Sequence, residues 1–263
     1  MATNTVYPNR VIESRAKDLL TTSVNTRNLM TVDTSLAQSE GMTKTINVYT
    51  YSGTVEKLAD GAKNTSRGSI TYTGKDYTVQ RAQQVFDYLD SDFMKDNTVV
   101  DNMLKGANQV MVNQMTADFI TEAKKATLEQ TFVKNGALGY DTIVDAISKL
   151  NLENESEIFV VIPNAWKAAL RKDEDYKSAR MGEVVYNGQV GTICGIPVIA
   201  TKALTDTAFV MTKEAIKLFM KNDVEVEQDR DIEAKKNTVA LTTYYFVALV
   251  DDTKICKITE AKA

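Results

Sequence analysis

The residues of this sequence best placed to do chemistry are carboxylates that stand at every second position of one segment near the C-terminal end. They are Asp223, Glu225, Glu227, Asp229, Asp231 and Glu233. Alternate side chains of a continuous β-strand point to the same face, so this spacing predicts a row of negative charge, the acidic ladder, along one strand. Carboxylates bind Ca²⁺ or Mg²⁺, and a pair of them can act as general acid and base.

A metal or catalytic site is the weaker hypothesis for the acidic ladder. Metal-binding loops usually curl around their ion with a glycine at the bend, but no glycine follows Gly195 in this chain. Carboxylates on one flat strand also repel one another unless a basic group or a cation lies opposite. The alternatives are a solvated strand face and a contact with a basic surface of a neighbouring subunit, and such a contact is favoured over a catalytic site.

Histidine is absent from all 263 residues. Its absence excludes Ser-His-Asp and Cys-His relays, imidazole zinc sites and a haem His ligand. Any chemistry would have to use carboxylates, lysines, hydroxyls or the two cysteines. Because the acidic ladder is the only candidate set and a weak one, we predict no enzyme activity, no catalytic residue, no cofactor and no metal. The 31 basic residues against 35 acidic ones give a net charge of −4, which does not favour nucleic-acid or membrane binding by the molecule as a whole.

The cysteines and the chain start indicate the compartment. Cys194 and Cys256 lie far apart, so we expect buried, unpaired side chains in a reducing environment. The first residues lack a basic and then apolar signal sequence, and the longest apolar run, Tyr244 to Val250, is too short for a membrane helix. These features predict a soluble cytoplasmic protein.

The first third of the sequence has too few apolar residues for a core. Residues 1–40 are rich in Thr, Asn and Ser and predict an arm with a short helix over 11–20. Residues 44–81 alternate as two strands around a polar, glycine-containing tip, with six basic side chains against three acidic ones. Such a hairpin is marginal alone, so we expect it to pack on a partner surface.

A long helix is the clearest element. It is predicted from Thr98 to about Ala126, with Thr98 and Asp101 at capping-box spacing. Its apolar stripe consists of Val100, Met103, Leu104, Ala107, Val110, Met111, Met115 and Phe119.

The remainder predicts a mixed α/β region followed by strands. Asp141 should cap a helix ending at Leu150, 157–162 is an apolar strand, and Asn164 should cap a second helix on which Trp166 packs against that strand. Further strands are expected over 208–211, 216–220 with the acidic ladder, 244–250 and the segment KICKIT.

This order of parts resembles the major capsid protein of tailed bacteriophages, the Hong Kong-type capsid fold shared with encapsulin shells. The stretches that carry the resemblance are FVVIPNAWKAAL (159–170), GTICGIPVIAT (191–201), AFVMTKEAIKLFMKNDVEVE (208–227) and the strand 244–250. The resemblance implies an α+β fold with an N-arm, an E-loop hairpin, a long spine helix in a P-domain and an α/β A-domain.

The resemblance also implies a division of the chain. It assigns the N-arm to 1–43, the E-loop to 44–82, the P-domain with its spine helix to 83–136, the A-domain to 137–218, the long P-domain strands to 219–247, and a return strand with the C-terminal tail to 248–263.

The implied function is self-assembly through pentamers and hexamers into an icosahedral shell around double-stranded DNA. The shell would form the virion capsid and assemble in the cytoplasm of the bacterial host. The expected partners are further copies of the chain, a portal protein, DNA held without sequence specificity, and a separate scaffolding protein, because Met1 leads almost directly into the arm. No membrane partner is expected.

Two alternatives stay open at this stage. One is an encapsulin-type compartment, and the other is a metal-dependent hydrolase centred on Asp229, Asp231 and Glu233. For the capsid, the candidate contacts between subunits pair the acidic ladder with Lys57, Lys63 and Arg67 at the hairpin tip.

Overall fold

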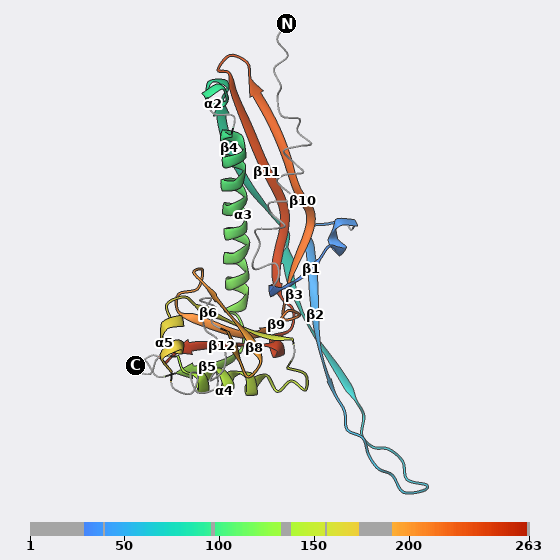
Figure 1. Cartoon of the computed structure of the whole chain (residues 1–263). Coiled ribbons are helices and arrows are strands. Elements are labelled where there is room, and N and C mark those ends of the chain that lie inside the picture. Colours follow the sequence, from blue (N-terminus) through green and yellow to red (C-terminus); the bar gives the residue numbers. More distant parts are fainter. Residues whose placement is uncertain are drawn as a thin grey trace.

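A four-stranded sheet forms the elongated body of the molecule (Figure 1). The computed structural model describes residues 29–38, 40–95, 98–132, 138–155, 157–173 and 191–261, so the helix predicted over 11–20 lies outside the described residues. The strand order is β1 (Thr31–Asp33), β10 (Ile216–Asp231), β11 (Lys236–Leu249) and β4 (Gln80–Leu89). β10 and β11 form a long antiparallel hairpin whose register runs from Ile216↔Leu249 to Asp231↔Lys236.

The long helix α3 (Val99–Ala123) covers one face of this sheet, and the short helix α2 (Asp90–Lys95) precedes it (Figure 1). Leu104, Met111 and Phe119 of α3 share one buried cluster with Val224 and Val226 of β10. The predicted helix and most of its apolar stripe are therefore confirmed.

Two details of the helix prediction are wrong. Val110 is 51% exposed, because it lies beside the buried stripe at a groove between α3 and β4. Thr98 has helical backbone angles, and its side chain makes no capping hydrogen bond. Instead, Asn102 Nδ2 donates to Thr98 Oγ1 at 3.4 Å.

A mixed six-stranded sheet forms the second body. Its strands, in spatial order, are β5 (Leu128–Phe132), β12 (Ile255–Glu260), β9 (Thr207–Thr212), β6 (Ile158–Pro163), β8 (Ile196–Thr201) and β7 (Thr192–Ile193). Helices α4 (Tyr140–Leu150) and α5 (Lys167–Lys172) accompany it, and η3 (Asp252–Lys254) precedes β12. Buried Ile143, Ile147, Val160 and Val210 form part of its core.

The two cap predictions in this region are wrong. The α4 N-cap position is Gly139, and Asp173 Oδ2 accepts the backbone N–H of Tyr140 at 2.9 Å, so Asp141 is simply a first-turn residue. Asn164 lies before the N-cap position of α5, which is Trp166. The backbone N–H of Asn164 donates to the carbonyl of Thr201.

Trp166 lies where it can close this core, as predicted. Its ring meets Phe132 edge-on at 5.0 Å between centroids. It also packs against the buried cluster that contains Ile158, Val160 and Ile162 of β6.

The expectation for the two cysteines is half right. Both are free thiols, and Cys256 is buried in β12, but Cys194 is exposed. Cys194 and Gly195 both have positive φ, 51° and 80°, and form the two-residue turn between β7 and β8. A tight hairpin of this kind places its central residues at the surface.

The predicted hairpin consists of β2 (Thr43–Ser52) and β3 (Ser69–Thr78), paired from Thr43↔Thr78 to Ser52↔Ser69. It projects far from both sheets (Figure 1). Its root packs against the four-stranded sheet and η2 (Ser35–Gln38) through a small cluster with Leu36, Phe219 and Phe246.

Two elements lie elsewhere than the expected division suggests. Residues 80–82 begin β4 in the four-stranded sheet, and β5 joins the six-stranded sheet, although the expected P-domain segment continued to 136. No helix in the described part of the chain has both the length and the apolar character that spanning a membrane requires.

Candidate subunit interface

The acidic ladder lies on the face of the four-stranded sheet opposite α3. Within β10, Asp223, Glu225 and Glu227 are exposed, whereas Val224 and Val226 between them are buried in the core beneath α3. Asp229 and Asp231 continue the exposed row to the end of the strand. The predicted alternation is therefore confirmed for five of the six carboxylates.

Glu233 is the exception, because β10 ends at Asp231. Asp231 Oδ1 accepts the backbone N–H groups of Glu233 and Ala234 at 2.9 and 3.1 Å, and Lys235 completes the turn with a φ of 52°. A side-chain acceptor of this kind stabilises a turn in place of the ladder hydrogen bonds.

Two basic residues beside the acidic ladder are paired with other carboxylates. Arg230 binds Asp90 at 2.8 Å, and Lys236 binds Asp87 at 2.6 Å. The pKa of Asp90 is lowered by hydrogen bonds from Asn237 and then from Arg230, and the pKa of Asp87 is lowered chiefly by Lys236.

Within the described residues, no lysine or arginine side chain forms an ion pair with a ladder carboxylate. The same residues contain no group of three or more His, Cys, Asp or Glu side chains that could hold a metal ion. The acidic ladder is thus a row of negative charge open to an external basic group.

The hairpin tip, residues 53–68, brings the three predicted basic residues into one exposed loop. Lys57, Lys63 and Arg67 all lie there with exposed side chains. Side chains close the two arms of the loop on each other: Thr54 and Ser66 hydroxyls are 2.7 Å apart, and Glu56 accepts from the backbone N–H and the hydroxyl of Thr65. These bonds hold the pKa of Glu56 below its ordinary value.

The structure does not bring the tip to the acidic ladder of the same molecule. The β10–β11 turn lies at one end of the body, and the hairpin leaves the other end pointing away from it (Figure 1). A contact between these two surfaces therefore needs two molecules.

An aromatic stack fixes the hairpin at its root. Tyr77 of β3 stacks on Phe246 with 5.6 Å between ring centroids, and Phe246 stacks on Phe219 at 4.8 Å. The Lys44 ammonium of β2 lies 4.2 Å from the Phe219 ring centre. Both strands of the hairpin are thus held by the β10–β11 pair.

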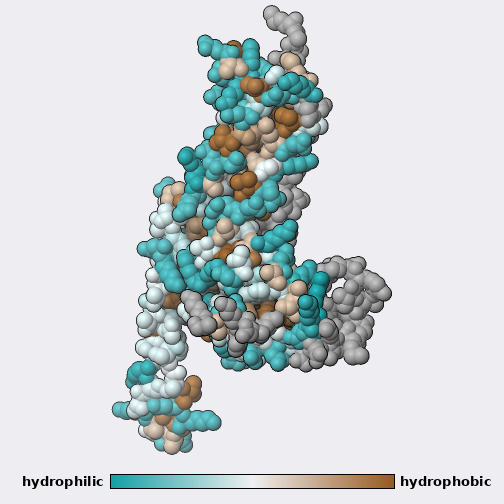
Figure 2. Space-filling model, turned by 90° about the vertical axis from the view of Figure 1, so that its left-hand side faces the viewer, coloured by the Kyte–Doolittle hydropathy of each residue, from teal (hydrophilic) through white to brown (hydrophobic). Residues whose placement is uncertain are grey.

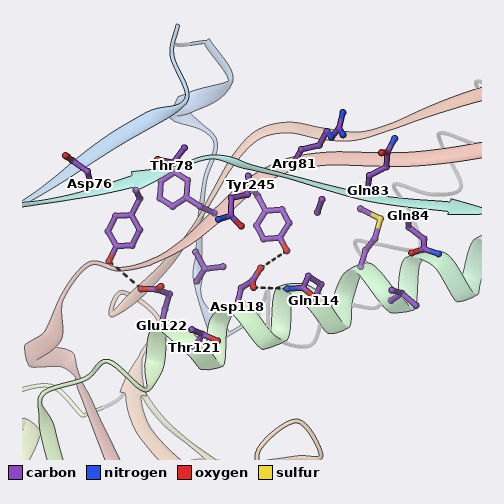
Figure 3. Close-up of a pocket in the computed structure, with 17 residues that line it drawn as sticks. Asp76, Thr78, Arg81, Gln83, Gln84, Gln114, Asp118, Thr121, Glu122 and Tyr245 are labelled. Carbon is purple, nitrogen blue, oxygen red and sulfur yellow. Dashed lines mark hydrogen bonds between the residues drawn. The ribbon is translucent and has the colours of Figure 1, made fainter.

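A groove of about 740 Å³ separates α3 from the segment where β3 passes into β4 (Figure 3). Tyr245 Oη donates to Asp118 Oδ2 at 2.8 Å, and Gln114 Nε2 donates to Asp118 Oδ1 at 3.0 Å. Tyr77 Oη donates to Glu122 Oε2 at 3.4 Å. The groove wall therefore joins the hairpin root and β11 to the C-terminal half of α3.

Burial is the main cause of the raised tyrosine pKa values in the groove wall. It raises the pKa of Tyr245, and the acceptor Asp118 raises it further. Burial and then Glu122 raise the pKa of Tyr77. Both hydroxyls therefore stay neutral and act as donors to the two carboxylates.

Sequence reasoning missed this groove and its hydrogen bonds. Tyr245 and Asp118 are 127 positions apart. The sequence placed Tyr245 in a strand and Asp118 on a helix, but no local pattern indicates that the two elements meet there.

Comparisons with known proteins agree on the fold. No family model matches the chain. A curated relative, the major capsid protein of Staphylococcus phage phiMR11, is 25% identical over 242 residues, which cover 87% of this chain and 84% of that protein.

Two solved structures illustrate the likeness in three dimensions. The capsid structure of the cyanophage P-SCSP1u has a TM-score of 0.70 at 12% identity and covers 89% of this chain and 87% of its own. The virus-like particle from Pyrococcus furiosus has a TM-score of 0.66 at 12% identity and covers 95% and 98%. The chain has the α+β capsid fold, and its resemblance to phage major capsid proteins is confirmed.

Proposed function

We propose that this chain is a major capsid protein whose function is to assemble with further copies of itself into a phage shell. The observation that carries the proposal is its similarity, over 87% of its length, to the major capsid protein of a Staphylococcus phage. The capsid fold along nearly the whole chain supports it. The role is structural and needs no catalytic group.

The elements take the roles that the resemblance implies. The β2–β3 hairpin is the E-loop, α3 is the spine helix, the four-stranded sheet is the P-domain, and the six-stranded sheet is the A-domain. Pentamers and hexamers of one chain need contacts that adapt to slightly different surroundings. A projecting hairpin that packs on the body at its root is suited to that task.

Contact between the hairpin tip and the acidic ladder is the finer part of the proposal. Lys57, Lys63 and Arg67 of one subunit would lie against the ladder carboxylates of another. Opposite charges steer such an encounter and fix its register, and salt weakens their attraction.

A charge-swap experiment tests this contact. We expect the triple variant Lys57→Glu, Lys63→Glu, Arg67→Glu to assemble poorly. The triple variant Glu225→Lys, Glu227→Lys, Asp229→Lys should fail in the same way, and the two sets combined should restore assembly. Normal assembly of the first variant, with unchanged salt dependence, would refute the contact.

The remaining partners follow from the proposed role. Packaged DNA would be enclosed without sequence reading, and a separate scaffolding protein and a portal protein would take part in assembly in the host cytoplasm. Size-exclusion chromatography of the purified chain tests the role itself. We expect pentamers, hexamers or megadalton particles, and a monomer that never assembles, even with its scaffold, contradicts it.

A protein compartment is the second candidate, because the Pyrococcus furiosus virus-like particle has a similar fold. The contents of purified particles distinguish the two. Nucleic acid inside supports the phage capsid, whereas a protein cargo without nucleic acid supports the compartment. The hydrolase hypothesis has no metal-binding group among the described residues to support it.

A further inference from the structure

The β2–β3 hairpin has two unlike faces. In the observed register, Tyr49 lies opposite Tyr72, and Tyr51 lies opposite Ile70. These four residues, the tyrosine face, alternate with a second set made of Val48, Thr50, Thr71 and Thr73, the threonine face. Tyr49 and Tyr72 are neighbours across the strands, with 6.3 Å between their ring centroids. One side of the hairpin is therefore aromatic, and the other carries mostly hydroxyls.

Two glycines leave the space that the Tyr51 side chain of the tyrosine face occupies. A Cβ at Gly68 would come within 2.1 Å of the Tyr51 hydroxyl, and a Cβ at Gly53 within 2.8 Å. The Tyr51 side chain therefore lies across the backbone at the neck of the tip loop. Toward the root, the next pair after Tyr49 and Tyr72 is Asn47 and Gly74. Glycines thus lie at both ends of the aromatic strip.

The tyrosine face has no cover among the described residues of its own molecule. Tyr49, Tyr51, Ile70 and Tyr72 are 66, 67, 48 and 64% exposed. The aromatic stack that fixes the hairpin involves Tyr77 at the root and stops there. Contiguous exposed aromatic and aliphatic side chains of this kind mark interaction surfaces.

We propose that the tyrosine face is the side of the hairpin that lies against a second copy of this chain, with the threonine face turned outward. The inference rests on the proposed function and adds which side chains are buried in the assembled state. Tyrosine suits such a contact because it buries a large apolar ring while its hydroxyl keeps a hydrogen-bonding partner.

Two observations select a second copy as the partner. The hairpin points away from the body of its own molecule, so its strands do not lie over that body (Figure 1). Its tip carries Lys57, Lys63 and Arg67, and the same chain exposes a complementary row of carboxylates on β10. A neighbouring copy can therefore supply both the acidic ladder that complements the tip and a surface that covers the tyrosine face.

Hydroxyl-radical footprinting of the purified chain tests the assignment. Tyr49, Tyr51 and Tyr72 should lose most of their reactivity when free subunits assemble into particles. Equal reactivity in free and assembled protein would overturn the proposal, and so would protection that appears only after a second protein is added.

A matched pair of variants gives an independent test. Tyr49→Ser with Tyr72→Ser should raise the protein concentration needed for assembly by about tenfold, the effect of losing a buried aromatic anchor. Thr50→Ser with Thr71→Ser, on the opposite face, should leave it unchanged. Circular dichroism of the free subunit should match the wild type in both cases, because all four side chains are exposed.

The possible outcomes separate the two proposals. If the wild type assembles and the tyrosine variant assembles equally well, the face assignment is wrong while the capsid function stands. If the wild type itself never assembles, the capsid function fails, and the face assignment falls with it.

Discussion

The carboxylates of α3 that face the groove take their donors from two other elements. Asp118 accepts from Tyr245 of β11, and Glu122 accepts from Tyr77 at the hairpin root (Figure 3). Lys125 also pairs with Glu122. Tyrosine hydroxyls that donate to carboxylates therefore join α3 to β11 and to the hairpin root. Hydrogen bonds to a carboxylate are stronger than those between neutral groups.

The Tyr245→Phe substitution removes one of these donors without changing the ring. We expect the free energy of unfolding of the free subunit to fall by about 1–2 kcal/mol, since Asp118 loses a partly buried donor. Urea unfolding measures the change. Tyr72→Phe is the control, because that side chain is exposed, and it should leave stability unchanged. Equal midpoints for wild type and Tyr245→Phe would contradict the role of this bond.

Alkaline pH should reduce the difference in the free energy of unfolding between the wild type and the Tyr245→Phe variant. Burial raises the pKa of Tyr245, so the folded state keeps the hydroxyl neutral while the unfolded chain ionises near pH 10. The stabilisation from this group is therefore complete below pH 10 and is lost as the pH rises above it. Between pH 9 and 11 the wild type should lose about 1.4 kcal/mol that the Tyr245→Phe variant keeps. A constant difference across that range would contradict the raised pKa.

The helix α3 is the element that most of the body depends on. Ala107 is buried in its middle, facing the sheet. Ala107→Pro removes a backbone hydrogen bond and introduces a clash with the preceding turn, at a cost of about 3 kcal/mol or more. We expect this variant to form no particles, and normal particles from it would refute the role of α3 as a spine.

The neighbouring residue provides a matched control. A Cβ added at Gly106 would meet open space. Gly106→Ala should therefore stabilise the helix by about 1 kcal/mol, because alanine restricts the unfolded chain more than glycine does. Its particles should form normally and melt at a higher temperature than those of the wild type.

Elements whose apolar residues recur at a regular spacing could be predicted from the sequence. The apolar stripe of α3, the buried strand β6 and the alternation along β10 all depend on which face of an element meets the core, and local spacing records that choice. The hairpin could be predicted because its alternation is clear and its apolar content is low.

What could not be predicted depends on distant partners or on local backbone geometry. Asp173 reaches the start of α4 from the far end of another helix, so the capping role assigned to Asp141 was wrong. Val110 belongs to the apolar spacing of α3 but faces the groove. Glu233 does not continue the acidic ladder, because Asp231 accepts its backbone N–H and β10 ends in a turn there.

The whole molecule separates its two charged surfaces. The acidic ladder occupies one end of the four-stranded sheet, and the basic tip of the hairpin extends from the other end (Figure 1). Figure 2 shows the hairpin as a thin projection that extends past the body, with hydrophilic and hydrophobic residues together at its tip. A chain with this arrangement can satisfy both surfaces by repeating the same contact from copy to copy, as assembly requires.

Electron microscopy of the purified recombinant chain, combined with the absorbance spectrum of its particles, tests the central claim most directly. We predict closed shells of uniform size built from pentamers and hexamers. When purified from cells that carry the complete packaging machinery, the same shells should contain nucleic acid. A monodisperse small species that forms no shells, with or without a scaffolding protein, would contradict the account.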